Sequence, residues 1–161
     1  MRDRDSSAED RGAAHLDELT GAYRRGPGFC ELERELARAT RLQESLAVVF
    51  VDVDGLKSVN DSRGHAAGDQ MLVHVAQVLG SKVRSYDTVV RYGGDEFFCV
   101  MSGLSAAAAQ VRLAEVNRLL HNLDGECSVS IGVAARKAGD TAADLVRRSD
   151  QALYCHRAGV R

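Results

Sequence analysis

The chain has 161 residues, enough for one domain with a sizeable core, and its 45% hydrophobic and 27% charged residues are typical of a globular protein. Its formal net charge of −2, from 21 basic and 23 acidic side chains, excludes a basic field for a nucleic-acid polymer or an anionic membrane surface. No apolar run approaches the roughly 20 residues of a membrane span, and no basic-then-apolar leader opens the chain. We therefore expect a cytoplasmic protein whose four widely spaced cysteines are small, buried and reduced.

The first predicted feature is a polar stretch over residues 1–15, which has almost no large apolar side chain and is interpreted as a tail or linker. The remaining residues, 16–161, are expected to form one domain. Residues 29–42 carry apolar side chains at helical spacing, and Pro27 suits the first turn of that helix.

The next segment, residues 46–53, is a nearly continuous apolar run of the length of a strand buried on both faces. Residues 60–68 are predicted to be a loop from their composition, and Asp69 is predicted to cap the following helix. Residues 88–92 and 97–101 then resemble two strands joined by a short connection.

The C-terminal third begins with a helix capped by Ser105 and extending to about His121. Residues 127–134 alternate like a strand, and Thr141 with Asp144 resembles a capping box that opens the last helix. This order predicts an α/β fold, more specifically an α+β sandwich in which a mixed central sheet is flanked by helices. The predicted buried positions of the helix after Ser105 are Val111, Ala114, Leu119 and Leu120.

The most informative stretch is the connection between the two strand-like segments, where Gly93 and Gly94 precede Asp95 and Glu96. A Gly-Gly pair predicts a tight hairpin turn, which we expect to use the positive φ that glycine tolerates. The bare backbone would let a bulky charged ligand approach two carboxylates. The alternative is a surface hairpin that carries two solvated acids.

Another acid, Asp52, ends the predicted buried strand. If this strand neighbours the hairpin, Asp52, Asp95 and Glu96 lie at one rim, where a divalent cation would relieve their mutual repulsion. Carboxylate oxygens suit Mg²⁺, which commonly works with substrate phosphates. The backbone N–H groups of the turn at Gly55 and Leu56 form a candidate anion site. Lys57, Arg157 and Arg161 could add positive charge, although each alone is typical of a solvated surface group.

Several motifs in a fixed order make the chain from about Asp17 to Arg161 resemble the GGDEF family of diguanylate cyclases. The central match is the signature over residues 91–97, with the sequence RYGGDEF. The other matching segments are residues 17–21 (DELTG) with Arg24-Arg25, 50–57 (FVDVDGLK), Asn60-Asp61, Gly64-His65, Gly68-Asp69, 84–87 (RSYD), 128–133 (SVSIGV) and 150–154 (DQALY).

This resemblance implies a palm-like fold related to nucleotidyl cyclases, with a ferredoxin-like core. It also implies condensation of two GTP molecules into cyclic di-GMP with release of two pyrophosphates. The implied cofactor is Mg²⁺, with Mn²⁺ as a substitute. Since each subunit of the family holds one GTP, the implied working form is a homodimer of two facing half-sites.

The resemblance also implies residue roles. Asp52 and Asp95 would hold the metal with help from the Val53 carbonyl, and Glu96 would be a second metal ligand or would aid deprotonation of the ribose hydroxyl. The implied substrate-binding residues are Asn60 and Asp69 at the guanine edge, His65 in the same loop, Gly55, Leu56 and Lys57 along the phosphates, Gly93 and Gly94 in the turn, and Arg157 and Arg161 reaching toward the phosphates.

Arg84 and Asp87 match the family's inhibitory RxxD site, which implies feedback binding of cyclic di-GMP. A surface Arg–Asp pair is the alternative interpretation. A second arginine for this site is not evident from the motif, and Arg112 and Arg118 are both candidates. The chain departs from the family at Leu56, where an aromatic residue is usual, and at Arg157, where lysine is typical.

Three functional hypotheses follow. The first is an active cyclase, which the intact signature favours. The second is a catalytically weak or inactive module that senses GTP or cyclic di-GMP, and the third is a dimerisation or scaffold domain. Loss of the signature acids would favour the last two.

Overall fold

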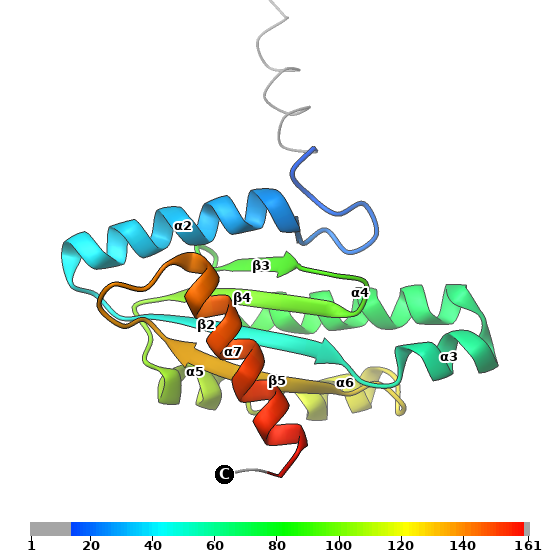
Figure 1. The fold of residues 1–161 in the computed structure, drawn as a ribbon. Coiled ribbons are helices and arrows are strands. Elements are labelled where there is room, and N and C mark those ends of the chain that lie inside the picture. The colour runs from blue at the N-terminus through cyan, green and yellow to red at the C-terminus, as the bar shows by residue number, and fades with distance from the viewer. Residues whose placement is uncertain (1–13, 160–161) are drawn as a thin grey trace, which may run out of the picture.

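A five-stranded mixed sheet forms the centre of the computed structural model, which describes residues 14–159 (Figure 1). Its strands lie side by side in the order β1-β3-β4-β2-β5. The β1–β3 pair is parallel, and the β3–β4, β4–β2 and β2–β5 pairs are antiparallel. The predicted α+β fold with a mixed sheet is therefore confirmed. The strands are β1 (Tyr23–Arg24), β2 (Leu46–Val53), β3 (Thr88–Arg91), β4 (Glu96–Ser102) and β5 (Val129–Ala135).

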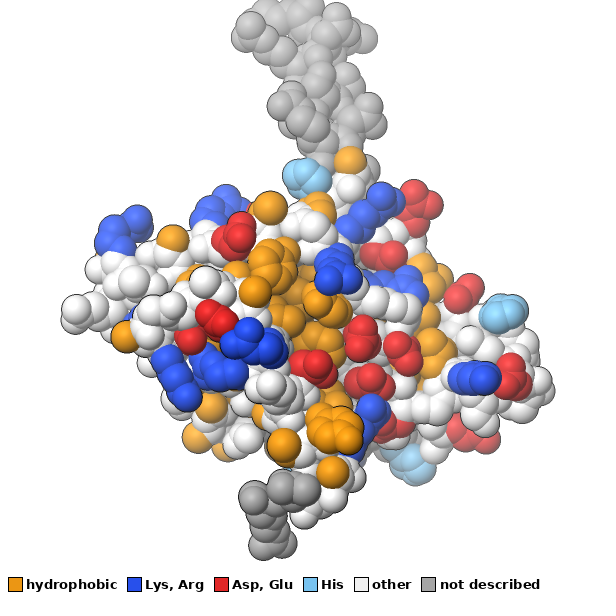
Figure 2. Space-filling model, in the orientation of Figure 1, with side chains coloured by type: hydrophobic (Ala, Val, Ile, Leu, Met, Phe, Trp, Pro, Cys, Tyr) orange, Lys and Arg blue, Asp and Glu red, His pale blue; other side chains and the backbone are white. Residues whose placement is uncertain are grey.

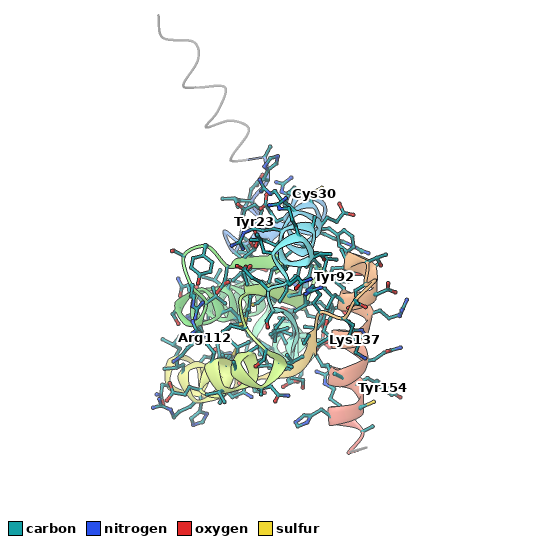
Figure 3. The ribbon with its side chains drawn as sticks, turned by 90° about the vertical axis from the view of Figure 1, so that its left-hand side faces the viewer. Tyr23, Cys30, Tyr92, Arg112, Lys137 and Tyr154 are labelled. Atoms are coloured by element: carbon teal, nitrogen blue, oxygen red, sulfur yellow. The ribbon has the colours of Figure 1, made fainter. Side chains whose placement is uncertain are left out.

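Helices cover both faces of the sheet, as the edge-on view in Figure 3 shows. The face toward the viewer in Figure 1 packs against α2 (Arg25–Leu42) and α7 (Ala142–Arg157). Side chains of β2 alternate between the faces, so Phe50 packs under α2 and α7 while Val51 faces the other layer. The second layer consists of α3 (Leu56–Arg63), α4 (His65–Lys82), α5 (Ala106–Leu113) and α6 (Val116–Leu123).

The predicted loop over residues 60–68 and the predicted cap at Asp69 are both wrong. Helix α3 continues through Arg63 and α4 begins at His65, so Gly64, with φ 86°, alone separates the two helices. Asp69 lies inside α4. Small polar residues made this stretch resemble a loop, but burial of apolar side chains from both helices outweighs their weak helix propensity.

The predicted helix after Ser105 is two helices, α5 and α6, with a break at Ala114 and Glu115. The Ser105 side chain caps α5 as expected, by accepting from the Ala108 N–H at 3.2 Å. The break changes which positions face the core, so Val111 is 76% exposed and Ala114 is also exposed, contrary to prediction. The buried positions are Ala109, Leu113, Val116 and Leu120.

Residues 1–13 of the predicted tail lie outside the described residues. The last residue of that tail, His15, contacts the start of the sheet, because its carbonyl accepts from the Arg24 N–H at 2.8 Å.

Of the cysteines, Cys99 and Cys127 are buried as expected. Cys30 and Cys155 are exposed, which corrects the expectation of four buried thiols. Among the described helices, none combines the length and the apolar character needed to cross a membrane.

Asp17 fixes the segment before β1 to the sheet. Its carboxylate accepts from the N–H of Thr20 at 2.9 Å and the hydroxyl of Thr20 at 2.7 Å, and it pairs with Arg91 at 3.1 Å. Burial acts to raise the pKa of Asp17, but the hydrogen bonds from Thr20 and the contact with Arg91 outweigh it and lower the pKa. The ionised carboxylate therefore stabilises the fold.

We expect Asp17→Asn to lower the free energy of unfolding by about 1–2 kcal/mol at pH 7, because it removes charge-assisted hydrogen bonds. Since the folded-state pKa lies below the unfolded one, this stabilisation is present above about pH 4 and is lost as pH falls through the folded-state value. Urea denaturation should thus show a smaller gap between wild type and variant at pH 3 than at pH 7. Glu18→Gln, at a side chain 92% exposed, is the control and should be neutral. An equal gap at both pH values would contradict the assignment.

Candidate functional site

The acids that the sequence predicted to converge do lie at one edge of the sheet. The register of β2 and β4 places Asp52 directly opposite Glu96, and residues so paired have their Cβ atoms about 5 Å apart. The Val53 N–H donates to the Asp95 carbonyl at 2.8 Å, which fixes the start of β4 beside the end of β2. We call this edge, with Asp52, Asp54, Asp95 and Glu96, the acidic rim. Figure 2 shows a group of acidic side chains beside an apolar hollow between α2 and α7.

The Gly-Gly connection is shaped differently from the prediction, because neither Gly93 nor Gly94 has a positive φ. The connection spans residues 92–95 and is closed by bonds from the N–H groups of Tyr92 (2.8 Å) and Gly93 (3.2 Å) to the Glu96 carbonyl. A Cβ at Gly93 would lie 2.6 Å from Glu96 Oε2. Glycine at residue 93 therefore leaves room for the Glu96 carboxylate, which a larger residue would push aside.

Glu96 borders the apolar hollow, a cavity of about 380 Å³ with aromatic walls from Phe29, Phe50 and Tyr92. Partial burial raises the pKa of Glu96, and the negative charges of Asp95, Asp52 and Asp150 raise it further. The rim thus has several carboxylates close together beside a cavity with an aromatic wall. A hard divalent cation fits this set of oxygen donors.

Asp54 is a member of the rim that the sequence interpretation did not include among the site residues. Its carboxylate accepts from the hydroxyls of Ser128 (3.0 Å) and Ser130 (2.8 Å) on or beside β5, and from Arg157 of α7 (2.6 Å). Partial burial opposes ionisation, but bonds from Ser130, Arg157 and Ser128 lower the pKa of Asp54. The signal in the sequence was its position two residues after Asp52, at the end of the same predicted strand.

Arg157 also donates to Asp52, at 2.9 Å from Oδ1, and to the hydroxyl of Ser130 at 2.9 Å. The sequence interpretation placed Arg157 at the phosphates, and the structure instead shows it paired with two rim carboxylates. Within residues 14–159, no three His, Cys, Asp or Glu side chains are gathered closely enough to form a ready-made metal site. The second predicted arginine, Arg161, lies outside the described residues.

Asn60, the predicted guanine reader, has an unusual environment. Its amide oxygen is buried and has no hydrogen-bond partner among the described residues. Gly68 of α4 packs directly against it, since a Cβ there would lie 1.8 Å from that oxygen. A buried acceptor without a partner is costly, so this oxygen is a candidate acceptor for a ligand N–H. Asp69 and His65 are exposed on the first turns of α4 nearby.

The predicted phosphate turn lies between the rim and Asn60. Gly55 has φ 72°, a left-handed conformation that favours glycine, and directly precedes α3. The first N–H groups of α3, from Leu56 and Lys57, have no acceptor within the helix and are available to an anion. The Lys57 side chain is exposed.

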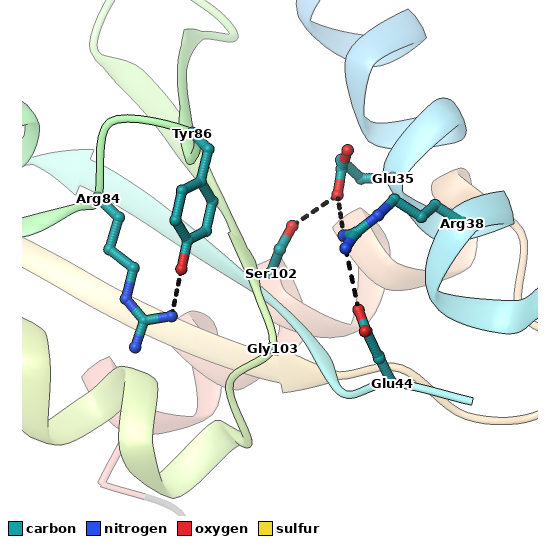
Figure 4. Close-up of a pocket in the computed structure, with 7 residues that line it drawn as sticks. All are labelled: Glu35, Arg38, Glu44, Arg84, Tyr86, Ser102 and Gly103. Carbon is teal, nitrogen blue, oxygen red and sulfur yellow. Dashed lines mark hydrogen bonds and ion pairs between the residues drawn. The ribbon is translucent and has the colours of Figure 1, made fainter. Parts of the chain in front are cut away.

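The predicted inhibitory motif borders a separate cavity of about 430 Å³ at the opposite end of β2 and β4 (Figure 4). Both oxygens of Asp87 already accept backbone bonds, from the N–H groups of Arg84 (2.8 Å) and Ser102 (3.1 Å). Arg112 and Arg118, the two candidates for a second arginine, do not line this cavity, whereas Arg38 of α2 does. Arg38 pairs there with Glu35 (3.3 Å) and Glu44 (3.4 Å).

Comparison with known proteins gives a consistent result. A family profile described as "Diguanylate cyclase, GGDEF domain" matches residues 14–161. The chain is 36% identical over 159 residues to diguanylate cyclase TpbB of Pseudomonas aeruginosa strain UCBPP-PA14, covering 93% of this chain and 37% of TpbB. It is 34% identical over 161 residues to the response regulator PleD of Caulobacter vibrioides strain NA1000, covering 92% of this chain and 35% of PleD. The chain thus spans little more than a third of the length of these relatives.

Solved structures show the same fold. The GGDEF domain of DgcB from Caulobacter crescentus, in complex with c-di-GMP, superimposes with a TM-score of 0.83 at 29% identity, covering 92% of this chain and 90% of that one. Diguanylate cyclase SiaD of Pseudomonas aeruginosa, in complex with its activator SiaC, gives a TM-score of 0.87 at 31% identity, covering 97% of this chain and 63% of SiaD. The predicted palm-like architecture is therefore confirmed.

Proposed function

Because the chain belongs to the GGDEF family of diguanylate cyclases, we propose that residues 16–161 form a catalytic domain that condenses two GTP molecules into cyclic di-GMP and releases two pyrophosphates. The observation that carries this proposal is the acidic rim, where Asp52 lies opposite Glu96 beside the phosphate turn at Gly55. The complete signature favours an active enzyme over a sensor or scaffold domain.

The residues that would hold Mg²⁺ are Asp52, Asp95 and Glu96, together with the Val53 carbonyl. Diguanylate cyclases of this family generally depend on a divalent metal, and the oxygen donors of the rim suit Mg²⁺, with Mn²⁺ as a substitute. When bound, such an ion would lower the pKa of the attacking ribose hydroxyl and neutralise charge on the leaving pyrophosphate.

The chain's own residues would bind and orient the nucleotide. Asn60 and Asp69 would read the guanine edge, because a buried amide oxygen and a carboxylate match the N–H donors that guanine presents and adenine lacks. The N–H groups of Leu56 and Lys57 would bind phosphate at the start of α3. Glu96 would be a second metal ligand or would accept the proton of the ribose hydroxyl.

The reaction needs two nucleotides, whereas one chain offers one guanine site and one acidic rim. We therefore propose a homodimer with two-fold symmetry in which the two sites face each other. The rate should then rise more steeply than linearly with protein concentration, wherever the dimer is not saturated.

The test is incubation of the purified chain with GTP and Mg²⁺ at high protein concentration, with chromatography of the products. Cyclic di-GMP and pyrophosphate, formed only with the metal, would support the proposal. Binding of nucleotide without product would select the sensor hypothesis, and no binding at all would select a scaffold.

A further prediction concerns feedback at the motif of Arg84 and Asp87. We propose that Arg84 binds cyclic di-GMP in the cavity of Figure 4, while Asp87 positions the loop through its bonds to the backbone of Arg84 and Ser102. Arg84→Ala removes charge-assisted hydrogen bonds worth about 1.5–3 kcal/mol, so the inhibitory concentration of added product should rise at least about tenfold. The initial rate without product should stay within about twofold, because the cavity lies at the other end of the sheet. Arg118→Ala, at an exposed arginine paired with Glu115, is the control. Unchanged inhibition in Arg84→Ala would contradict the site.

A further inference from the structure

Arg157 links three chain segments at the acidic rim. One terminal guanidinium nitrogen donates to both Asp52 Oδ1 (2.9 Å) and Asp54 Oδ1 (2.6 Å), and the Nε atom donates to Ser130 Oγ (2.9 Å). Arg157 is the last residue of α7. The end of that helix is thereby fastened to the ends of β2 and β5.

The two carboxylates depend on Arg157 to different degrees. Asp54 keeps two hydroxyl donors, Ser128 and Ser130, and its N–H donates to the Ser128 carbonyl at 2.9 Å. Among the described residues, Asp52 has no side-chain hydrogen bond other than the one from Arg157. Departure of Arg157 would leave Asp54 in place and Asp52 free to bind another cation.

Arg157 occupies Oδ1 of Asp52, so a divalent metal bound to this carboxylate would lie within a few ångströms of the guanidinium. Two positive groups so close repel each other, and each therefore weakens the binding of the other. Arg157 is also able to leave, because its side chain is 40% exposed and it extends from the final turn of α7 rather than from the packed part of the helix.

From these contacts we propose that Arg157 is a resident cation of the rim, which neutralises Asp52 and Asp54 until a metal-bound nucleotide arrives and then transfers to the triphosphate. This inference rests on the proposed function for its second half, the transfer to phosphate. The first half, competition between Arg157 and a bare metal ion, stands on the observed contacts alone. The exchange would favour entry of the metal together with its nucleotide over entry of the metal by itself.

The test compares wild type, Arg157→Ala and Arg157→Gln in two binding experiments without turnover. Binding of Mn²⁺ alone, followed by electron paramagnetic resonance, should become roughly tenfold tighter in both variants, because a competing charge is lost. Binding of 3′-deoxy-GTP with Mg²⁺, followed by calorimetry, should become weaker, because a phosphate ligand is lost. If Arg157→Ala does not fold, the comparison of wild type with Arg157→Gln decides both binding experiments.

Two further variants sharpen the comparison. Arg38→Ala is the matched control, since Arg38 also bridges two carboxylates with a side chain 43% exposed but lies at the other end of the sheet, and it should not change Mn²⁺ affinity. Arg157→Lys keeps the charge and should stay near wild type. Equal or weaker Mn²⁺ binding in both neutral variants would overturn the proposal, as would the absence of Mn²⁺ binding in every protein.

The nucleotide experiment separates this inference from the proposed function. If wild type fails to bind 3′-deoxy-GTP, the proposed substrate and the transfer to phosphate are wrong, whereas the Mn²⁺ comparison still decides the competition. Tighter nucleotide binding in the neutral variants would overturn the transfer.

Discussion

Asp52→Asn and Glu96→Gln should each lower the rate of cyclic di-GMP synthesis at least about 10³-fold while the fold is retained. Both changes keep the shape of the side chain and remove one negative charge from a pair that the sheet register places face to face. Neither amide can replace a carboxylate as a strong ligand of a hard cation. The rate is measured as product formed from GTP and Mg²⁺, and thermal unfolding checks the fold.

Glu115→Gln is the matched control, because it removes a charge from a side chain that is 52% exposed and contacts Lys82 and Arg118 but no residue of the rim, and it should leave the rate unchanged. The two rim variants should also be separable from a folding defect by their retained binding of GTP through Asn60 and Asp69. Substantial synthesis by either rim variant would contradict the assignment of the acids, even if wild type is an active cyclase.

The convergence of these acids was predictable from the sequence because strand pairing is a strong constraint. The apolar run over residues 46–53 favours a buried strand, and the hairpin after Thr88 is the adjacent partner that carries Asp95 and Glu96. Once the two strands pair, residues at their ends must share an edge. The local pattern predicted the strands and their ends, whereas their pairing was an assumption that the register of β2 and β4 confirms.

The partners of Arg157 were not predictable in the same way. The contact between Arg157 and Asp52 joins residues 105 positions apart in sequence, and it depends on the angle at which α7 crosses the sheet. No periodicity encodes that angle. The positive φ expected for the Gly-Gly pair was also wrong, because neither glycine has one, and an added Cβ at residue 93 would meet only the end of the Glu96 side chain.

The close packing of α7 on the sheet depends on Gly132. Gly132 lies on β5 directly beneath α7, and a Cβ there would lie 2.1 Å from the Ser149 carbonyl oxygen and 2.2 Å from the Leu153 nitrogen. Both atoms belong to the helix backbone, so no side-chain rotation can relieve the collision. Glycine at residue 132 is therefore what allows the helix to lie close on the sheet.

Gly132→Ala should accordingly destabilise the protein by about 3–5 kcal/mol, more than ordinary overpacking costs, because the whole of α7 must shift. The shift should also separate Arg157 from Asp52, so that any folded fraction shows altered Mn²⁺ binding at the rim. Urea denaturation measures the first effect. Gly80→Ala is the matched control within α4, where an added Cβ meets nothing within 4 Å, and it should stabilise by up to about 1 kcal/mol through helix propensity. A Gly132→Ala protein as stable as wild type would mean that α7 does not lie against β5 as described, and the resident-cation geometry of Arg157 would fail with it.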